Sequence, residues 1–519
     1  MWTVWTSLHR VKPLDLTVQG DAGFFNYSAV FRGGFWGSVG VALLLGAGPL
    51  VLMAIVAPLL AGAAHVAGTG ARWVTRGLLA LPLACFAPLP IALAWSVEHR
   101  HDFSGPDAAA ALSAAVLLMV AGLVTGVGVT LFLAALRQRD RGRAPIAAVA
   151  VVWGLGVLTV LAVTLQQFTF PYAITHGGPR DATRTPVLMM VQQAYARYSL
   201  GTGAAVVTLI GILVGVLGLA ATLLLVLTRA RLEVDPAYRS AEQPTGWTAG
   251  RIVAAVLAGV GLLIVLVITL IGLLPWLRHA GNQGTLPDKI SAGTVLAHTW
   301  VPPLISTVVG VGVALLAAVG IGVFRPFGRW SYLLLLPFGP WLFVGPALLA
   351  LPTFGHGGSD SAAGALTRLI PPSLVTIPAL FVLTLLLHGQ QRRRIAAGLG
   401  ATAGLAKTLV LPVLPMVALV GGVTWLVQAQ DLFWSYSQVQ DPKDGPAQLL
   451  LLVQFEQTFG IANRLSYGLV LPLAVVVVLF LAALALQWGY LDRVALRVGE
   501  DRPPADDPPS ADGALRPAG

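Results

Sequence analysis

The stretch over residues 166–201, QQFTFPYAITHGGPRDATRTPVLMMVQQAYARYSLG, joins two long apolar segments of the chain. It opens with aromatic residues and passes through a Gly-Gly-Pro turn at residues 177–179. A threonine-rich strip follows, and then an amphipathic run over residues 187–198. A plain connector between membrane helices needs only a few polar residues. The pattern therefore predicts an ordered segment between two membrane spans.

The composition of the whole chain is that of a polytopic helical membrane protein. Of 519 residues, 56% are hydrophobic and 10% are charged, and the mean hydropathy is +0.80. Soluble domains are about 25% charged, and a helix needs about 20 apolar residues to cross a bilayer. The alternating strands of a membrane barrel are not evident. We expect an all-α fold with about eleven transmembrane helices. These spans cover residues 37–64, 73–96, 107–136, 145–167, 202–228, 249–277, 293–324, 330–352, 363–389, 404–427 and 465–488.

The distribution of the basic residues predicts the orientation of the chain. The formal net charge is +10, but the arginines gather at the ends of apolar runs, which indicates membrane topology and not nucleic-acid binding. Arginine-rich loops at residues 137–143 and 392–394 fall on one side of the membrane. The positive-inside rule makes that side cytoplasmic. The N-terminus and residues 166–201 are then expected outside, and the C-terminus inside.

The remaining charged and reactive residues exclude several classes of protein. None of the 22 acidic residues falls in the middle of an expected span. Ion-driven carriers usually bind their ion through buried carboxylates, so the sequence argues against a secondary transporter. It contains no phosphate-binding GxxxxGK[ST] motif and no GxSxG nucleophile motif. We therefore expect no enzymatic activity, no cofactor and no metal site.

Two parallel sets of features divide the chain near a polar linker at residues 235–248. In each set an apolar span ends in glutamines and continues into an aromatic outer segment, at residues 166–172 and again at residues 428–436. Tandem halves in membrane proteins often enclose a pathway between them. The predicted organisation is a first permease-like half over residues 1–240, a second over residues 241–499, and a disordered cytoplasmic tail over residues 500–519.

The stretch over residues 166–201 resembles the corresponding region of carbohydrate ABC importer permeases of the maltose type. In that family an aromatic segment leads through a Gly-Gly-Pro turn and a threonine-rich strip to an external helix. The resemblance implies two type I permease subunits fused in one multi-pass protein of the bacterial plasma membrane. It implies separate ABC ATPase subunits and an external solute-binding lipoprotein as partners, besides membrane lipid, and no nucleic acid. The matching residues are Phe168, Tyr172, Thr175, Gly177, Gly178, Pro179, Thr183, Thr185, Tyr195 and Gly201.

The same resemblance suggests where such an importer would meet its substrate and its binding protein. Polar and aromatic side chains at the ends of the two matching spans suit a hydroxyl-rich solute, although they also suit polar helix ends at the membrane interface. The candidates to line the pathway are Thr164, Gln166, Gln167, Thr424, Trp425 and Gln428. The expected docking residues for the binding protein are Tyr172, Gly177, Gly178 and Pro179.

The expected contact with the ATPase departs from the family pattern. The family's coupling loop begins with E-A-A, whereas the second half has Ile395-Ala396-Ala397 without the acid, and the first half has no legible motif. A permease-derived sensor or scaffold that no longer couples to ATP hydrolysis is therefore the main alternative. A lipid-linked enzyme using Asp15 and Asp21 as an acid–base pair is a further one. The candidate coupling residues are Arg137, Arg139, Arg141, Arg143, Arg392, Arg393, Arg394, Ala396 and Ala397.

Overall fold

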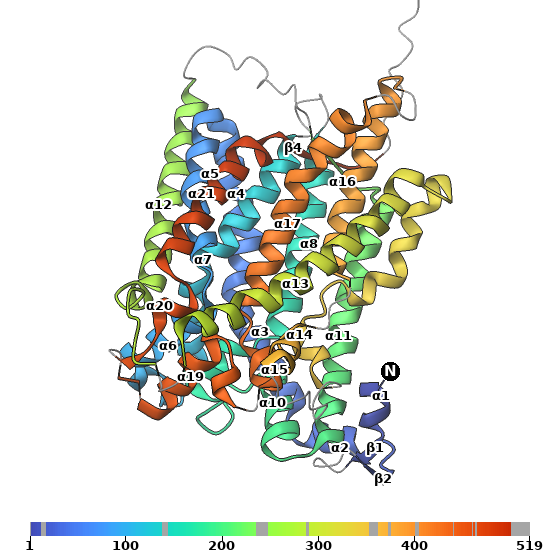
Figure 1. Ribbon diagram of the computed structural model, residues 1–519. Helices are drawn as coiled ribbons and strands as arrows, with labels where there is room; N and C mark the ends of the chain where they lie inside the picture. Colours follow the sequence, from blue (N-terminus) through green and yellow to red (C-terminus); the bar gives the residue numbers. More distant parts are fainter. Residues whose placement is uncertain are drawn as a thin grey trace, which may run out of the picture.

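Long helices running side by side make up most of the molecule (Figure 1). The computed structural model describes residues 2–11, 17–137, 144–234, 248–286, 290–351, 362–371, 375–399, 404–439, 441–458, 460–461 and 464–499. Within these residues, eight helices are long and apolar enough to cross a membrane. The protein is therefore a helical, multi-pass membrane protein, because a helix satisfies its own backbone polar groups in lipid. The eight are Phe35–Ala67 (α3, η1 and α4), Ala108–Leu136 (α7), Ile146–Leu165 (α8), Leu200–Leu227 (α11), Ala249–Leu277 (α12), Ala292–Phe324 (α13 and η5), Ala406–Ala429 (η8 and α17) and Leu473–Arg493 (α21 and η11).

The other three expected spans are not single continuous helices. The span at 73–96 consists of α5 (Thr69–Ala84) and α6 (Pro88–Glu98), which are bent by 78° at the break. Proline disfavours helical geometry in the residue before it and starts a new helix well. The expected span at 330–352 is a 3₁₀ helix, η6 (Gly328–Trp341), followed by the short α14 (Pro346–Leu349).

The third of these, at 363–389, covers α15 (Ala362–Arg368) and the first part of α16 (Ile377–Ala396). Eleven continuous spanning helices are therefore not observed. Prolines explain most of the difference in the other two segments, because a proline inside a helix removes a donor and clashes with the preceding turn. Pro337 and Pro340 both lie inside η6.

Short elements collect at one end of the helices (Figure 1). We call this end the outer end and the opposite end the inner end, after the sides that the sequence predicts. The N-terminal segment forms α1 (Trp2–Ser7), an antiparallel hairpin of β1 (His9–Val11) and β2 (Val18–Asp21), and α2 (Phe25–Arg32), all next to α11. We call this the N-terminal module. The remaining short elements include η2 (Arg100–Phe103), α9 (Thr169–Thr175), α10 (Pro186–Val191), η4 (Gln192–Ala196), α18 (Leu432–Gln438), η9 (Pro442–Asp444), α19 (Ala447–Thr458) and α20 (Tyr467–Val470).

A two-stranded sheet lies at the opposite end. Strand β3 (Arg231–Val234) follows α11, and strand β4 (Val494–Arg497) follows α21. The strands are antiparallel, with Arg231 opposite Arg497 and Val234 opposite Val494. The segment that follows α11, the last long helix before the linker, is thus paired with the segment that follows α21, the last long helix of the described chain.

Several elements pack across the linker in a reciprocal way. Helix α5 packs against α21, and η6 packs against α11. Helix α7 contacts β4, and α16 contacts β3. Helix α12 follows the linker in sequence but packs extensively against α4 and α7, which precede it. The boundary at residue 240 stays a prediction, and residues 235–247 and 500–519 lie outside the described part of the chain.

Candidate functional site

Two segments at the outer end each consist of a long helix that ends in glutamine and a short helix that follows it. Gln166 ends α8 with φ −102° and ψ 9°, and Gln430 ends α17 with φ −101° and ψ 7°. A seven-residue helix follows each glutamine, α9 in the first case and α18 in the second. Tyr172 and Tyr436 lie six positions after the respective glutamines. The two segments therefore share the conformation of the terminal glutamine and the spacing to the tyrosine, whereas α9 begins three residues after Gln166 and α18 two residues after Gln430.

The two tyrosines meet in an aromatic cluster made of Phe168, Tyr172, Phe433 and Tyr436. The Tyr172 and Tyr436 ring centroids are 5.3 Å apart, and the Tyr172 hydroxyl donates to the Tyr436 hydroxyl at 3.4 Å. Phe168 stacks on Tyr172 at 4.8 Å and meets Phe433 edge-on at 5.1 Å. Burial, and then the hydrogen bond with Tyr436, raise the pKa of Tyr172, so its hydroxyl stays protonated.

The three predicted pathway residues at the end of α8 make contacts with other parts of the protein. The Gln166 side-chain amide donates to the carbonyl of Phe343 at 2.8 Å, and its oxygen accepts from the Gly345 amide at 2.7 Å. Gln166 therefore joins α8 to the turn between η6 and α14. Thr164 is buried where α8 packs on α3. The Gln167 carbonyl accepts from the Thr185 hydroxyl at 2.7 Å.

The other three predicted pathway residues lie on α17. The Trp425 indole donates to the carbonyl of Trp300 at 2.9 Å. The Gln428 side chain accepts from the Thr307 hydroxyl at 3.4 Å, and Thr424 is half-buried. Helix α8 packs mainly on α3 and α11, whereas α17 packs on α13 and α16. The two groups therefore lie on helices without extensive mutual packing, and whether they line one pathway stays a prediction.

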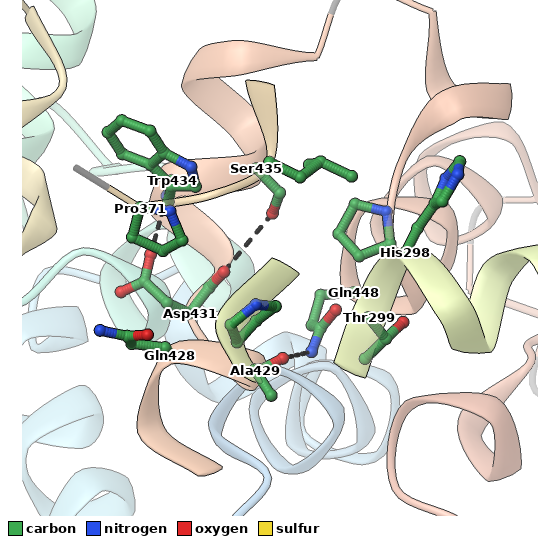
Figure 2. A pocket seen from close by; sticks show the side chains of 12 residues that line it. His298, Thr299, Pro371, Gln428, Ala429, Asp431, Trp434, Ser435 and Gln448 are labelled. Atoms are coloured by element: carbon green, nitrogen blue, oxygen red, sulfur yellow. Dashed lines mark hydrogen bonds between the residues drawn. The ribbon is translucent and has the colours of Figure 1, made fainter. Parts of the chain in front are cut away.

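Gln428 faces a polar cavity between α13, α17, α18 and α19 (Figure 2). The cavity includes about 270 Å³ of space between atoms, part of it open to solvent. Figure 2 shows Asp431 and Trp434 on one side and His298 and Thr299 on the other. The lining residues are His298, Thr299, Pro303, Leu369, Pro371, Gln428, Ala429, Asp431, Trp434, Ser435, Pro446 and Gln448.

Asp431 is the acidic residue of this cavity. It precedes α18, and its carboxylate accepts from the Trp434 amide at 2.7 Å, which caps the helix. Burial raises the pKa of Asp431 to about 6, because the charged form loses solvation. The backbone hydrogen bonds oppose that shift without cancelling it. The carboxyl can therefore exist in either protonation state near neutral pH.

Further polar atoms around the cavity have unused hydrogen-bonding capacity. Gln448 donates to the Ala429 carbonyl, but its side-chain oxygen is buried without a hydrogen-bond partner among the described residues. The same is true of the Trp434 indole nitrogen and of His298 Nδ1. Leaving such a group unpaired costs about 1–3 kcal/mol. Donors and acceptors in one cavity can satisfy a molecule that carries hydroxyl groups.

At the inner end, two arginines share one carboxylate. Arg137 contacts Asp492 at 3.0 Å and Arg76 contacts the same oxygen at 3.3 Å, and both arginine side chains are buried. The side chain of Arg137 is therefore not part of the exposed inner surface. The sequence analysis did not foresee this cluster, because its partners are more than 350 positions apart. Arg139, Arg141 and Arg143 lie outside the described residues.

The second coupling segment begins as a helix. Arg392 and Arg393 lie in the last turns of α16, Arg394 is buried beside them, and the exposed residues follow. Ala396 and Ala397 are exposed, and Ile395 is 60% exposed. This surface is open to a partner at the inner end, and its coupling role stays a prediction.

The predicted docking turn is ordered. Thr175 and Thr183 share a hydrogen bond of 2.6 Å, and the Thr183 hydroxyl donates to the Gly178 carbonyl at 2.8 Å. Gly177 has φ 86°, in the left-handed region that glycine tolerates best. Pro179 follows at the half-buried surface, with Tyr172 beneath in the aromatic cluster. Whether a binding protein docks here is untested by these contacts.

The described residues include one member of the predicted acid–base pair, so the pair stays a prediction. Asp15 lies outside the described residues, and Asp21 is exposed and contacts His9 at 3.1 Å. Among the described residues there is also no group of three histidine, cysteine or acidic side chains placed to hold a metal ion. Comparisons with protein-family models, with curated proteins and with solved structures found no match to this chain.

Proposed function

We propose that the chain is the transmembrane permease of an importer in the bacterial plasma membrane. Two tandem halves carry a carbohydrate or similar polar solute between them. Separate ABC ATPase subunits drive it, and an external solute-binding protein supplies it. The observation that carries this proposal is the contact between Tyr172 and Tyr436, each of which lies six positions after a glutamine that ends a long helix with nearly the same φ and ψ.

A two-fold relation between the halves accounts for the contacts at both ends. Equivalent residues can touch each other only where they lie on a two-fold axis, as in the self-complementary interface of a symmetric dimer. Tyr172 meets Tyr436 at the outer end, and β3 pairs antiparallel with β4 at the inner end, so that the first residue of each strand lies opposite the last residue of the other. Away from such an axis, equivalent elements exchange partners, as α5 with α21 and η6 with α11 do. The axis would run along the interface where a solute could cross.

The groups around the polar cavity suit a hydroxyl-bearing solute, and the cavity, which has room for about one water molecule, would have to widen to admit a carbohydrate. It offers a carboxyl, an amide oxygen and indole and imidazole nitrogens, and the unpaired atoms are those of Gln448, Trp434 and His298. An apolar solute would leave these groups without hydrogen bonds. The carboxylate would repel a strongly anionic solute. A neutral polyhydroxyl compound matches both donors and acceptors.

A second candidate is a permease-derived sensor or scaffold. The β3–β4 sheet favours it, because the paired strands and the Arg497–Glu233 ion pair of 3.8 Å between them connect the inner ends of α11 and α21. An importer must open this end to release its solute. A protein that has lost transport would keep it closed.

Purification of the chain in mild detergent from its own host distinguishes the two. A permease brings a nucleotide-binding subunit with it, and the reconstituted complex hydrolyses ATP faster when its solute is added. Ile395→Glu on the exposed inner surface should release that subunit, whereas Val18→Glu, at an exposed position of β2 at the outer end, should leave it bound. A monomeric chain without ATPase activity would instead support the scaffold.

A further inference from the structure

Helix α2 of the N-terminal module has two different faces. Asn26 and Val30 are buried, and the Asn26 amide donates to the carbonyls of Ser7 at 2.9 Å and His9 at 3.2 Å. The opposite side is aromatic and uncovered. The exposed fractions are 80% for Phe24, 56% for Phe25 and 43% for Phe31.

The aromatic face continues directly onto the first spanning helix. Helix α3 begins at Phe35, after a corner at Gly33 and Gly34, where Gly34 has φ 87°. Trp36 is 61% exposed and stacks on Phe31 at 6.2 Å. Because α2 adjoins the start of a span, it lies at the level of the bilayer surface.

The corner between the two helices is held in place. Arg184 donates to the Gly33 carbonyl at 2.6 Å and contacts Asp181 at 2.8 Å. The buried Asn26 anchors α2 to the hairpin at the same time. The aromatic face therefore has a defined direction relative to α3, whose own exposed side includes Leu43 and Leu44.

Charge adds a second feature to this surface. The Arg10 guanidinium lies over the Phe25 ring, 5.7 Å from its centroid, and Arg32 ends α2 on the exposed side. Aromatic rings prefer the level of the lipid headgroups. Arginine close by favours anionic headgroups. Rings and guanidinium groups together fit a lipid surface better than a water-facing one.

We propose that α2 is a membrane-interface helix. Phe24, Phe25, Phe31 and Trp36 enter the leaflet on the side of the N-terminal module, and Arg10 and Arg32 face the phosphates of anionic lipids. The helix fixes the height of the module above the bilayer. This inference depends on α3 crossing the membrane and not on transport, so it can hold or fail independently of the proposed function.

The test places a fluorescent label at single positions of the full-length protein in nanodiscs. The chain has one cysteine, Cys85, which is buried, and Cys85→Ala removes it. Bimane-labelled Phe24→Cys and Phe31→Cys report the aromatic face, and Asp21→Cys on the adjacent hairpin is the matched control. We expect doxyl-labelled lipids to quench the labels at positions 24 and 31 and iodide to quench the label at position 21.

Two outcomes overturn parts of the proposal. If iodide quenches all three labels equally and doxyl lipids quench none, α2 faces water or a soluble partner, and the interface helix is rejected. The lipid charge is tested with phosphatidylcholine discs that contain or lack phosphatidylglycerol. Phosphatidylglycerol should increase lipid quenching at position 24, and Arg10→Gln with Arg32→Gln should abolish the increase. Equal quenching in both lipids rejects the anionic headgroups.

Discussion

The hydroxyl of Tyr172 donates a hydrogen bond to the hydroxyl of Tyr436 across 3.4 Å, although the residues are 264 positions apart in the chain. Each tyrosine follows a glutamine that ends a long helix in the same backbone conformation. A contact between equivalent residues is the simplest sign of an internal two-fold relation, and it closes the outer end between α9 and α18. Because the two residues touch, cross-linking can test the two-fold relation.

Cross-linking should detect the contact between the two tyrosines. In a Cys85→Ala chain, Tyr172→Cys with Tyr436→Cys should react with a short bismaleimide, because the replaced rings lie 5.3 Å apart between centroids. With a protease site inserted in the linker at residues 235–247, a cross-linked chain stays one band after cleavage on a denaturing gel. Tyr172→Cys with Ile395→Cys, an exposed position after the linker at the inner end, should separate into two bands. Separation of the tyrosine-derived pair would contradict the contact.

The shared carboxylate at the inner end should contribute strongly to stability. Asp492→Asn removes the carboxylate that the buried Arg76 and Arg137 share, and breaking such a cluster costs about 3–5 kcal/mol. Asp181→Asn is the matched control, because its partner Arg184 lies near the surface and the Asp181 side chain is 55% exposed. The control should change stability by about 0–1 kcal/mol. Thermal unfolding in detergent measures both, and equal shifts would show that the cluster is not a special contributor.

Asp431 should make stability depend on pH with a defined sign. Its pKa rises from 3.8 to about 6 on folding, so the folded state holds the proton more tightly than the unfolded state. Stability is therefore highest below the unfolded pKa and falls as pH rises through 6, by roughly 3 kcal/mol for such a shift. Asp431→Asn keeps a good helix cap and removes the titration.

The comparison is the difference in melting temperature between the two proteins across pH 4 to 8, an interval of about two units on either side of this pKa. Wild type should lose stability relative to Asp431→Asn as pH rises. Asp441→Asn, at an exposed position, serves as the control and should track wild type. A constant difference between wild type and Asp431→Asn would disprove the buried titration.

Substitutions of Gln166 and of its neighbour Gln167 can test the contact between α8 and the turn after η6. Gln166→Leu leaves the Phe343 carbonyl and the Gly345 amide without their partners, at about 1–3 kcal/mol for each buried group. Gln167→Leu is the control, since its printed contact to Thr185 is made by the backbone carbonyl. In denaturant, Gln166→Leu should therefore unfold more easily than Gln167→Leu. Similar stabilities would mean that the Gln166 bonds add little.

Sequence reasoning found the long apolar helices because their composition alone decides them, as in α8 and α11. It counted residues 73–96 and 330–352 as spans, and the structure shows that these proline-containing segments are interrupted. Neither the Asp492 cluster nor the packing of α12 against α4 was accessible, because both depend on distant parts of the chain. Gln428 was placed at a polar site, but Asp431 and Gln448 were not singled out as its neighbours.

The pairing of β3 with β4 has a further consequence for how the chain is joined. Strand β3 comes before the linker and β4 near the end, so the ladder fastens the polypeptide to itself and closes everything between them into a ring. The Arg231 guanidinium strengthens this connection by donating a hydrogen bond to the Gly499 carbonyl at 2.6 Å. A single nick in the linker would open this ring without freeing either piece. The molecule would then consist of two polypeptides that the β3–β4 sheet still joins.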